Sequence, residues 1–195
     1  DQKSIDKKQN DQMFQRMADQ LEVAADYYRE QLKHATKAIS YLKQRGLSGE
    51  LAARFKIGYA PDGLRNLSQI FADYDQDESE NLLLRNGLVI KSNNGKYYDC
   101  FWVCIIFPIL NQKGQIIGFG GRVIDAASGP KYLNSPETPL FIKSRELYNL
   151  FSARKAIRES GRVLVVEGYM DVVMLSQYGI EYAVATLGTA TTSSH

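Results

Sequence analysis

Ten consecutive residues carry most of the structural information in this chain: Arg162-Val163-Leu164-Val165-Val166-Glu167-Gly168-Tyr169-Met170-Asp171. The apolar run 163–166 is typical of a strand buried on both faces of a parallel sheet. Gly168 permits a sharp turn, and apolar residues at helical spacing follow it. Glu167 and Asp171 therefore flank a strand-to-helix turn, where open α/β sheets place their ligands. A cap on the helix or a surface ion pair is the alternative role for such an acid.

The end of the chain extends this pattern into a βαβ unit. We predict strands over 162–166 and 182–185, with a helix over 170–178 between them and a right-handed crossover. The residues 186–195 predict a loop that enters a further helix, because Ser and Thr favour caps. Two parallel strands do not form a stable sheet alone, so we expect the chain to be a fragment of a longer protein.

Composition indicates a folded protein with one large domain or two smaller ones, since 44% of the 195 residues are apolar. The longest apolar run, 101–110, is too short to span a bilayer, and no signal peptide opens the chain, so we expect the cytoplasm. Cys100 and Cys104 have no second Cys or His cluster nearby, which indicates buried thiols rather than a zinc site. Eight basic and four acidic residues fall within 111–160, which favours polyanion binding there.

The first 87 residues predict helices. Apolar spacing indicates a long helix over 13–32, a second that stops at Gly46, a third capped by Ser48, and two short ones over 64–71 and 78–85. A break is expected at 58–63.

The next residues, 88–142, predict antiparallel strands. Two Asn-Gly-containing turns, 92–95 and 111–114, separate apolar strands over 88–91, 96–98, 101–110 and 115–119. The glycines of 118–121 would let a ligand approach the backbone closely, although the spacing is not that of a phosphate loop. An irregular, proline-interrupted loop over 130–139 holds Lys131 and Asn134, which either bind a ligand or satisfy nearby backbone.

Six segments in this order resemble bacterial DnaG-type DNA primases. They are Tyr41–Leu47, Phe55–Pro61, Gly118–Val123, Pro130–Thr138, Val165–Val172 and Ala185–Thr189. The resemblance covers the amino-terminal part of the family's RNA polymerase domain and implies an α+β fold. On this basis we expect a mixed helical and antiparallel-sheet subdomain over 1–142 (helical over 1–87, strands and basic loop over 88–142), followed by an incomplete α/β toprim subdomain over 143–195.

The same resemblance implies a function for the parent protein. A DnaG-type primase is a DNA-directed RNA polymerase of the primosome, which makes RNA primers on single-stranded DNA for replication by metal-dependent nucleotidyl transfer. Glu167 would serve in acid/base or metal chemistry, and Asp171 would help to hold Mg²⁺ or Mn²⁺. Template DNA, ribonucleoside triphosphates and the RNA–DNA hybrid would contact a basic groove that contains Arg122, Lys131, Asn134, Lys143 and Arg145. Zinc and the replicative helicase would bind domains of the family that this chain lacks.

Two departures from the family pattern limit this transfer. Cys100, Trp102 and Cys104 stand where the family usually has arginines, so part of the basic groove is missing; Trp102 would either join the core or stack on a base. The toprim Asp-x-Asp motif has no counterpart before His195, so we expect this chain alone to be inactive. The alternatives are a non-catalytic single-stranded-DNA-binding module and another toprim enzyme, such as a topoisomerase or nuclease.

Overall fold

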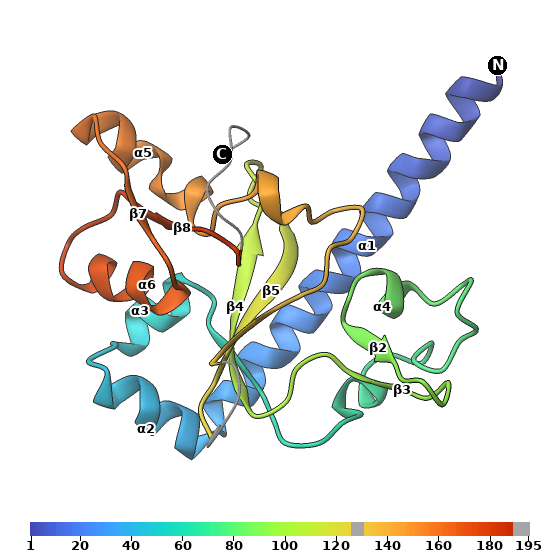
Figure 1. Cartoon of the computed structure of the whole chain (residues 1–195), viewed down its shortest axis with the longest axis horizontal. Coiled ribbons are helices and arrows are strands. Elements are labelled where there is room, and N and C mark those ends of the chain that lie inside the picture. The colour runs from blue at the N-terminus through green and yellow to red at the C-terminus, as the bar shows by residue number, and fades with distance from the viewer. Residues whose placement is uncertain (126–130, 189–195) are drawn as a thin grey trace.

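The computed structural model describes residues 1–125 and 131–188 (Figure 1). Its centre is a four-stranded antiparallel sheet with strand order β1-β4-β5-β6. The strands are β1 (Gly58–Ala60), β4 (Cys104–Leu110), β5 (Ile116–Val123) and β6 (Tyr132–Asn134). β4 and β5 form the predicted hairpin, in which the Asn111 amide donates to the Gln115 carbonyl at 2.9 Å. The turn at 111–114 is therefore confirmed.

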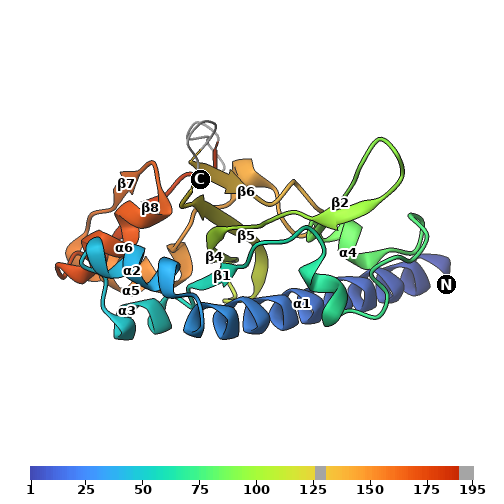
Figure 2. The same ribbon diagram turned by 90° about the horizontal axis from the view of Figure 1, so that it is seen from below.

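Helix α1 (Gln2–Lys33) runs along the sheet, as Figure 2 shows. It buries an apolar stripe that includes Met17, Leu21 and Tyr28. Gly58 of β1 lies directly against this helix, because a Cβ there would come within 2.6 Å of the Tyr28 Cβ. The helix begins eleven residues before the predicted start at residue 13. Residues 2–12 are exposed and, apart from Ile5, polar, so no apolar stripe marks them, but they continue the helix with side-chain pairs such as Gln2 with Asp6.

Short elements pack around this frame. They are α2 (Thr36–Gln44), α3 (Gly49–Arg54), the 3₁₀ helix η1 (Asn66–Gln69), α4 (Leu82–Arg85) and a separate hairpin of β2 (Val89–Lys91) with β3 (Tyr97–Asp99). The Ser48 hydroxyl accepts from the Leu51 amide at 3.1 Å, which confirms the predicted cap. Asn81 caps α4 in the same way, so this helix starts at Leu82 and not at residue 78.

Three predictions about strands were wrong. Residues 58–60 form β1 rather than a break, because pairing with β4 sets their conformation and three residues show no period. Residues 132–134 form β6 inside the predicted loop, where β5 supplies the hydrogen-bonding partner. β4 begins at Cys104 instead of residue 101, since Val103 has a φ of 48° and leaves the extended conformation.

The carboxy-terminal part contains the predicted parallel βαβ unit. After the 3₁₀ helix η2 (Lys143–Arg145) come α5 (Leu150–Ser160), β7 (Leu164–Val166), α6 (Tyr169–Gln177) and β8 (Ala183–Ala185), with β7 parallel to β8. The predicted burial of β7 on both faces was wrong: Val163 and Val165 are 50% and 47% exposed, whereas β8 is fully buried. Among residues 1–125 and 131–188, β7 pairs with β8 alone, so its apolar side chains stay open to solvent. The helix predicted after 186 lies outside the described residues.

The glycines of β5 serve the core and not a ligand. A Cβ at Gly118 would meet the Phe141 ring at 3.1 Å, one at Gly120 the Tyr169 ring at 2.2 Å, and one at Gly121 the Phe101 ring at 3.0 Å. The close approach predicted from these glycines is thus made by aromatic rings of the same chain.

Both cysteines are free thiols. Cys104 is buried and Cys100 is partly buried, and burial raises the pKa of each thiol to about 12. Neither thiol is therefore a thiolate near neutral pH.

No helix among the described residues is long and apolar enough to cross a membrane.

Candidate functional site

The two predicted acids flank the turn between β7 and α6. Glu167 follows the last residue of β7, and Asp171 lies in the first turn of α6, whose N-cap is Gly168 in an extended conformation. Both acids are exposed. Within the described part of the chain, no ion pair or side-chain hydrogen bond engages either carboxylate, so both remain available to a ligand from outside.

Oxygen ligands of this kind suit a hard divalent cation. No group of three or more His, Cys, Asp or Glu side chains among residues 1–125 and 131–188 is arranged to hold a metal ion. Glu167 and Asp171 therefore supply part of a coordination shell, and Mg²⁺ commonly completes such a shell with water and phosphate oxygens.

Tyr169 fixes this turn to the central sheet. Its ring stacks on Phe107 of β4 at a centroid distance of 5.4 Å and meets Tyr148 edge-on at 4.9 Å. The ring also covers the backbone of Gly120 in β5. Tyr169, which lies between the two acids in the sequence, is thus anchored in the core, while Glu167 and Asp171 face solvent.

Tyr132 of β6 reaches the same turn. A Cβ built on Gly168 would lie 3.2 Å from Asp171 Oδ2 and 3.5 Å from Tyr132 Oη. Burial raises the pKa of Tyr132, the nearby Arg122 guanidinium opposes this rise, and the Asp171 charge adds to it. β6, the strand within the basic loop, is therefore adjacent to Asp171, which was predicted to bind the metal.

Arg122 holds Tyr132 in place. Its guanidinium lies 5.1 Å from the centre of the Tyr132 ring and 5.7 Å from that of Tyr41, and Nη1 donates to the Val123 carbonyl at 2.8 Å. Arg122 is only 9% exposed, and its Nε is buried without a hydrogen-bond partner. The resemblance implies that this side chain lines a basic groove; in the structure it is buried against the Tyr41 and Tyr132 rings, and Nη1 also approaches the Lys131 carbonyl at 3.4 Å.

The other predicted basic-loop residues fall into two groups. Lys131 is exposed at the start of β6, and Asn134 ends β6 with its amide nitrogen 3.0 Å from a Cβ position built on Gly188. Lys143 lies on η2, where its charge is close enough to oppose the burial-driven rise in the Cys100 pKa. Arg145 is exposed on the same short helix, and no described contact links it to the acids.

Sequence reasoning missed the tyrosines that build this site. Tyr41, Tyr132 and Tyr169 lie in three different segments: Arg122 lies over the rings of Tyr41 and Tyr132, and the Tyr132 ring meets that of Tyr169 edge-on at 6.1 Å. An excess of tyrosine, twelve in this chain, was the available signal. Trp102, whose place was left open between core and surface, is 41% exposed.

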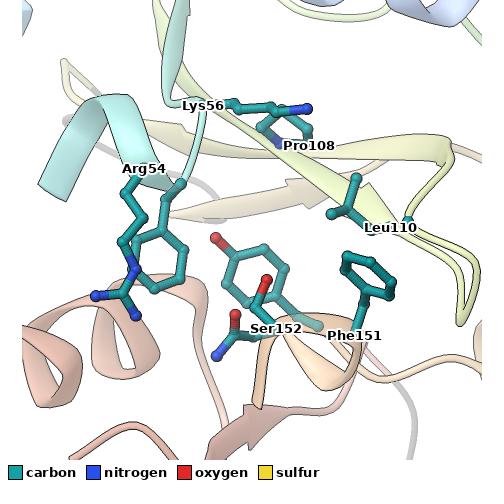
Figure 3. Close-up of a pocket in the computed structure, with 10 residues that line it drawn as sticks. Arg54, Lys56, Pro108, Leu110, Phe151 and Ser152 are labelled. Carbon is teal, nitrogen blue, oxygen red and sulfur yellow. The ribbon is translucent and has the colours of Figure 1, made fainter. Parts of the chain in front are cut away.

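A separate cavity of about 190 Å³ lies between α3, β4 and α5 (Figure 3). Arg54 and Lys56 form one wall, Pro108 and Leu110 another, and Phe151 and Ser152 of α5 face them. None of the seven predicted site residues lines this cavity, so it is distinct from the acidic turn.

A strand that ends in an acid, followed by a glycine turn and a helix with a second acid, places the carboxy-terminal part among toprim proteins. A model of the Toprim domain matches residues 161–195, and a model described as the DNA primase catalytic core, N-terminal domain, matches residues 27–154. The chain belongs to the DnaG-type DNA primase family.

Curated relatives agree with this assignment. A DNA primase of Neisseria meningitidis is 54% identical over 171 residues, which is 88% of this chain and 28% of the relative. A DNA primase of Escherichia coli is 48% identical over 87% of this chain and 29% of its own length. The chain thus spans less than a third of these relatives.

A solved DnaG primase catalytic domain bound to single-stranded DNA has the same fold. It superposes with a TM-score of 0.84 at 45% identity, covering 94% of this chain and 59% of the solved chain. The predicted α+β fold class and the family resemblance are confirmed.

Proposed function

We propose that this chain is the amino-terminal part of the polymerase core of a primase that makes RNA primers on single-stranded DNA for replication. One observation carries the proposal: two exposed carboxylates without an ion pair in the described part of the chain, Glu167 and Asp171, lie on a turn that Tyr132 joins to β6, the strand that Lys131 directly precedes. The acids favour a divalent cation, and the lysine favours a nucleic-acid or nucleotide phosphate. The boundary between the two subdomains falls at 142/143 in this proposal.

In this mechanism each side chain has one physical task. The carboxylates would hold Mg²⁺ or Mn²⁺, which would supply Lewis-acid activation of the primer 3′-hydroxyl and charge neutralisation of the triphosphate. Lys131, Lys143 and Arg145 attract the phosphates of template and nucleotide. Arg122 acts from a buried position through the placement of Tyr132 and β6, and Asn134 acts from a partly buried one.

The remaining ligands and partners belong to the longer protein. Glu167 and Asp171 would supply only part of a metal shell, so we expect the 195-residue chain alone to be inactive in primer synthesis. Zinc and the replicative helicase engage domains outside this chain, and the site of action is the cytoplasm, where the replicated DNA lies.

The test is primer synthesis by the longer protein from ribonucleoside triphosphates on single-stranded DNA with Mg²⁺. We expect Glu167→Gln and Asp171→Asn each to lower the rate by at least two orders of magnitude, about 2.7 kcal/mol of transition-state stabilisation. The exposed Glu159→Gln on α5 is the matched control. Full activity in both acid variants, or primer synthesis by the 195-residue chain alone, would refute this assignment.

A non-catalytic single-stranded-DNA-binding module is the second candidate, which the basic loop and the incomplete acid set favour. It predicts salt-dependent DNA binding by the longer protein without primer synthesis. Cleavage of DNA by the longer protein would instead indicate a topoisomerase or nuclease.

A further inference from the structure

Trp102 is a large apolar side chain on the surface of this protein. It is 41% exposed, and its ring meets Tyr98 of β3 edge-on at a centroid distance of 6.2 Å. Tyr98 is itself only partly buried. An open indole next to a second ring is an arrangement that suits contact with a flat partner.

The backbone turns this indole outward. Residues 102 and 104 would face the same side of a regular strand, and Cys104 is fully buried. Val103 lies between them with a φ of 48°, a left-handed conformation that is rare for a β-branched residue. The left-handed residue breaks the alternation, so Cys104 enters the core while Trp102 faces solvent.

Two lysines border the segment that carries Trp102. Cys104 pairs with Val123 of β5, and the Val123 amide donates to the Lys131 carbonyl at 2.8 Å. The backbone of Lys131 therefore lies two strand spacings, roughly 10 Å, from the backbone of Cys104. On the other side, the Lys143 charge acts on the Cys100 thiol.

Of the acids near this segment, Asp125 pairs with Lys37, while Asp62, two residues beyond the Ala60 partner of Cys104, is exposed. Burial keeps both thiols protonated, and Asp99 is 2% exposed, with its carboxylate accepting from Tyr74 and from the Leu67 amide. The exposed rings thus lie near cationic side chains, and the buried Asp99 carboxylate is met by two hydrogen-bond donors. Such a combination of positive charge and aromatic surface favours unpaired bases of a polyanion.

We propose that Trp102, supported by Tyr98, is a stacking site for an unpaired base of single-stranded DNA. This inference rests on the proposed DNA groove and adds to it a contact that reads no sequence, because every base offers a flat face. Lys131 and Lys143 hold the phosphates on either side of the stacked base. An aromatic contact here takes the place of charge in binding the template.

The chain contains its own probe, because Trp102 is its single tryptophan. We expect its emission, excited where tyrosine does not absorb, to be quenched as an oligodeoxythymidylate is added to the 195-residue chain at low salt. An abasic oligonucleotide of the same length keeps the phosphates and should bind more weakly, without quenching.

Variants separate stacking from simple proximity. Stacking contributes about 1–3 kcal/mol per base, so Trp102→Ala should weaken binding of a labelled oligodeoxythymidylate about 5- to 150-fold, measured by anisotropy. Trp102→Phe keeps an aromatic ring and should lose less. Tyr178→Ala removes another exposed ring, 78% accessible at the end of α6, and should change nothing.

The outcomes distinguish this inference from the function on which it rests. Salt-dependent binding with unchanged Trp102 emission, and equal affinity of Trp102→Ala, would overturn the stacking site and leave the DNA groove intact. Absence of binding by anisotropy at low salt would overturn both. Strong quenching that the abasic oligonucleotide also produces would show proximity to phosphate alone and would contradict stacking.

Discussion

Tyr169 lies on the backbone of Gly120, so close that a Cβ at residue 120 would stand 2.2 Å from Tyr169 Cζ. This contact joins the helix that follows the acidic turn to the central strand β5. The Tyr169 ring also contacts the rings of Phe107, Tyr148 and Tyr132, so it is closely packed and buried. The position of Glu167 and Asp171 relative to the sheet therefore depends on residue 120 being a glycine, which leaves room for the Tyr169 ring.

Gly120→Ala should displace Tyr169 and destabilise the protein by about 1–3 kcal/mol, since overpacking a tight core costs this much. Urea denaturation measures the change. The matched control is Gly49→Ala at the start of α3, where no atom lies within 4 Å of the Cβ position. Alanine favours helix by about 0.5–1 kcal/mol over glycine, so the control should be as stable as the parent chain or slightly more stable. Equal stability of Gly120→Ala and the parent chain would contradict the packing described for this residue.

Periodicity predicted the elements whose pattern is local. The apolar stripe of α1, the Ser48 cap and the turn at 111–114 each depend on residues within a few positions of one another, and all are confirmed. β1 and β6 escaped prediction because three-residue strands are defined by the partner strand. The exposure of β7 was not predicted, because its apolar sequence is typical of a strand with neighbours on both sides. Among the described strands, only β8 pairs with it.

The candidate site was predictable only in part. The two acids follow from the order strand, glycine, helix, and the structure places them on that turn. The aromatic neighbours of the two acids were not predictable in this way. Tyr132 meets Arg122 through the register of β5 with β6, and Tyr41 meets Arg122 through ring packing. Likewise, Arg122 is buried by the rings of Tyr41 and Tyr132 and bonds to the carbonyls of Val123 and Lys131. The spacing of these residues in the sequence does not indicate that they meet.

Asp99 provides a pH-dependent test of the β2–β3 region. Its carboxylate is buried and accepts from the Tyr74 hydroxyl at 2.7 Å and from the Leu67 amide at 3.2 Å. Burial raises the pKa of Asp99, and the Tyr74 hydrogen bond lowers it again in part. Tyr74→Phe removes that hydrogen bond, so the Asp99 pKa should rise further and the fold should lose about 1–3 kcal/mol near neutral pH.

The sign of the pH dependence follows from linkage. With a raised pKa the folded state binds more protons than the unfolded state, so the contribution of Asp99 to stability is complete below 3.8 and declines as the pH rises through the folded pKa. The stability difference between the parent chain and Tyr74→Phe should therefore widen with rising pH. Tyr98→Phe is the control, because neighbouring residues of a strand point to opposite faces, and Tyr98 is partly exposed whereas Asp99 is buried. A difference that stays constant from acid to neutral pH would show that Tyr74 does not act through the Asp99 charge.

Lys131 and Lys143 should determine how strongly salt weakens DNA binding. Each phosphate contact to a single strand contributes about 0.7 to the slope of log affinity against log salt, so Lys131→Ala with Lys143→Ala should reduce that slope by about 1.4. Lys113→Ala at the tip of the β4–β5 hairpin removes an exposed lysine outside the candidate groove and should leave the slope unchanged. Equal slopes in the double variant and the control would remove these lysines from the DNA contact.

Glu167 and Asp171 should matter little for folding, in contrast to Gly120. Both carboxylates are exposed and lack ion pairs in the described part of the chain, so the stability cost of Glu167→Gln plus Asp171→Asn should stay within about 1 kcal/mol, mostly from the lost interaction of Asp171 with the α6 dipole. A chelator should leave the melting temperature of the 195-residue chain unchanged, because two carboxylates form an incomplete shell. Marked destabilisation by either treatment would mean that the acids support the fold, and the loss of primer synthesis predicted for the longer protein would then no longer identify them as catalytic.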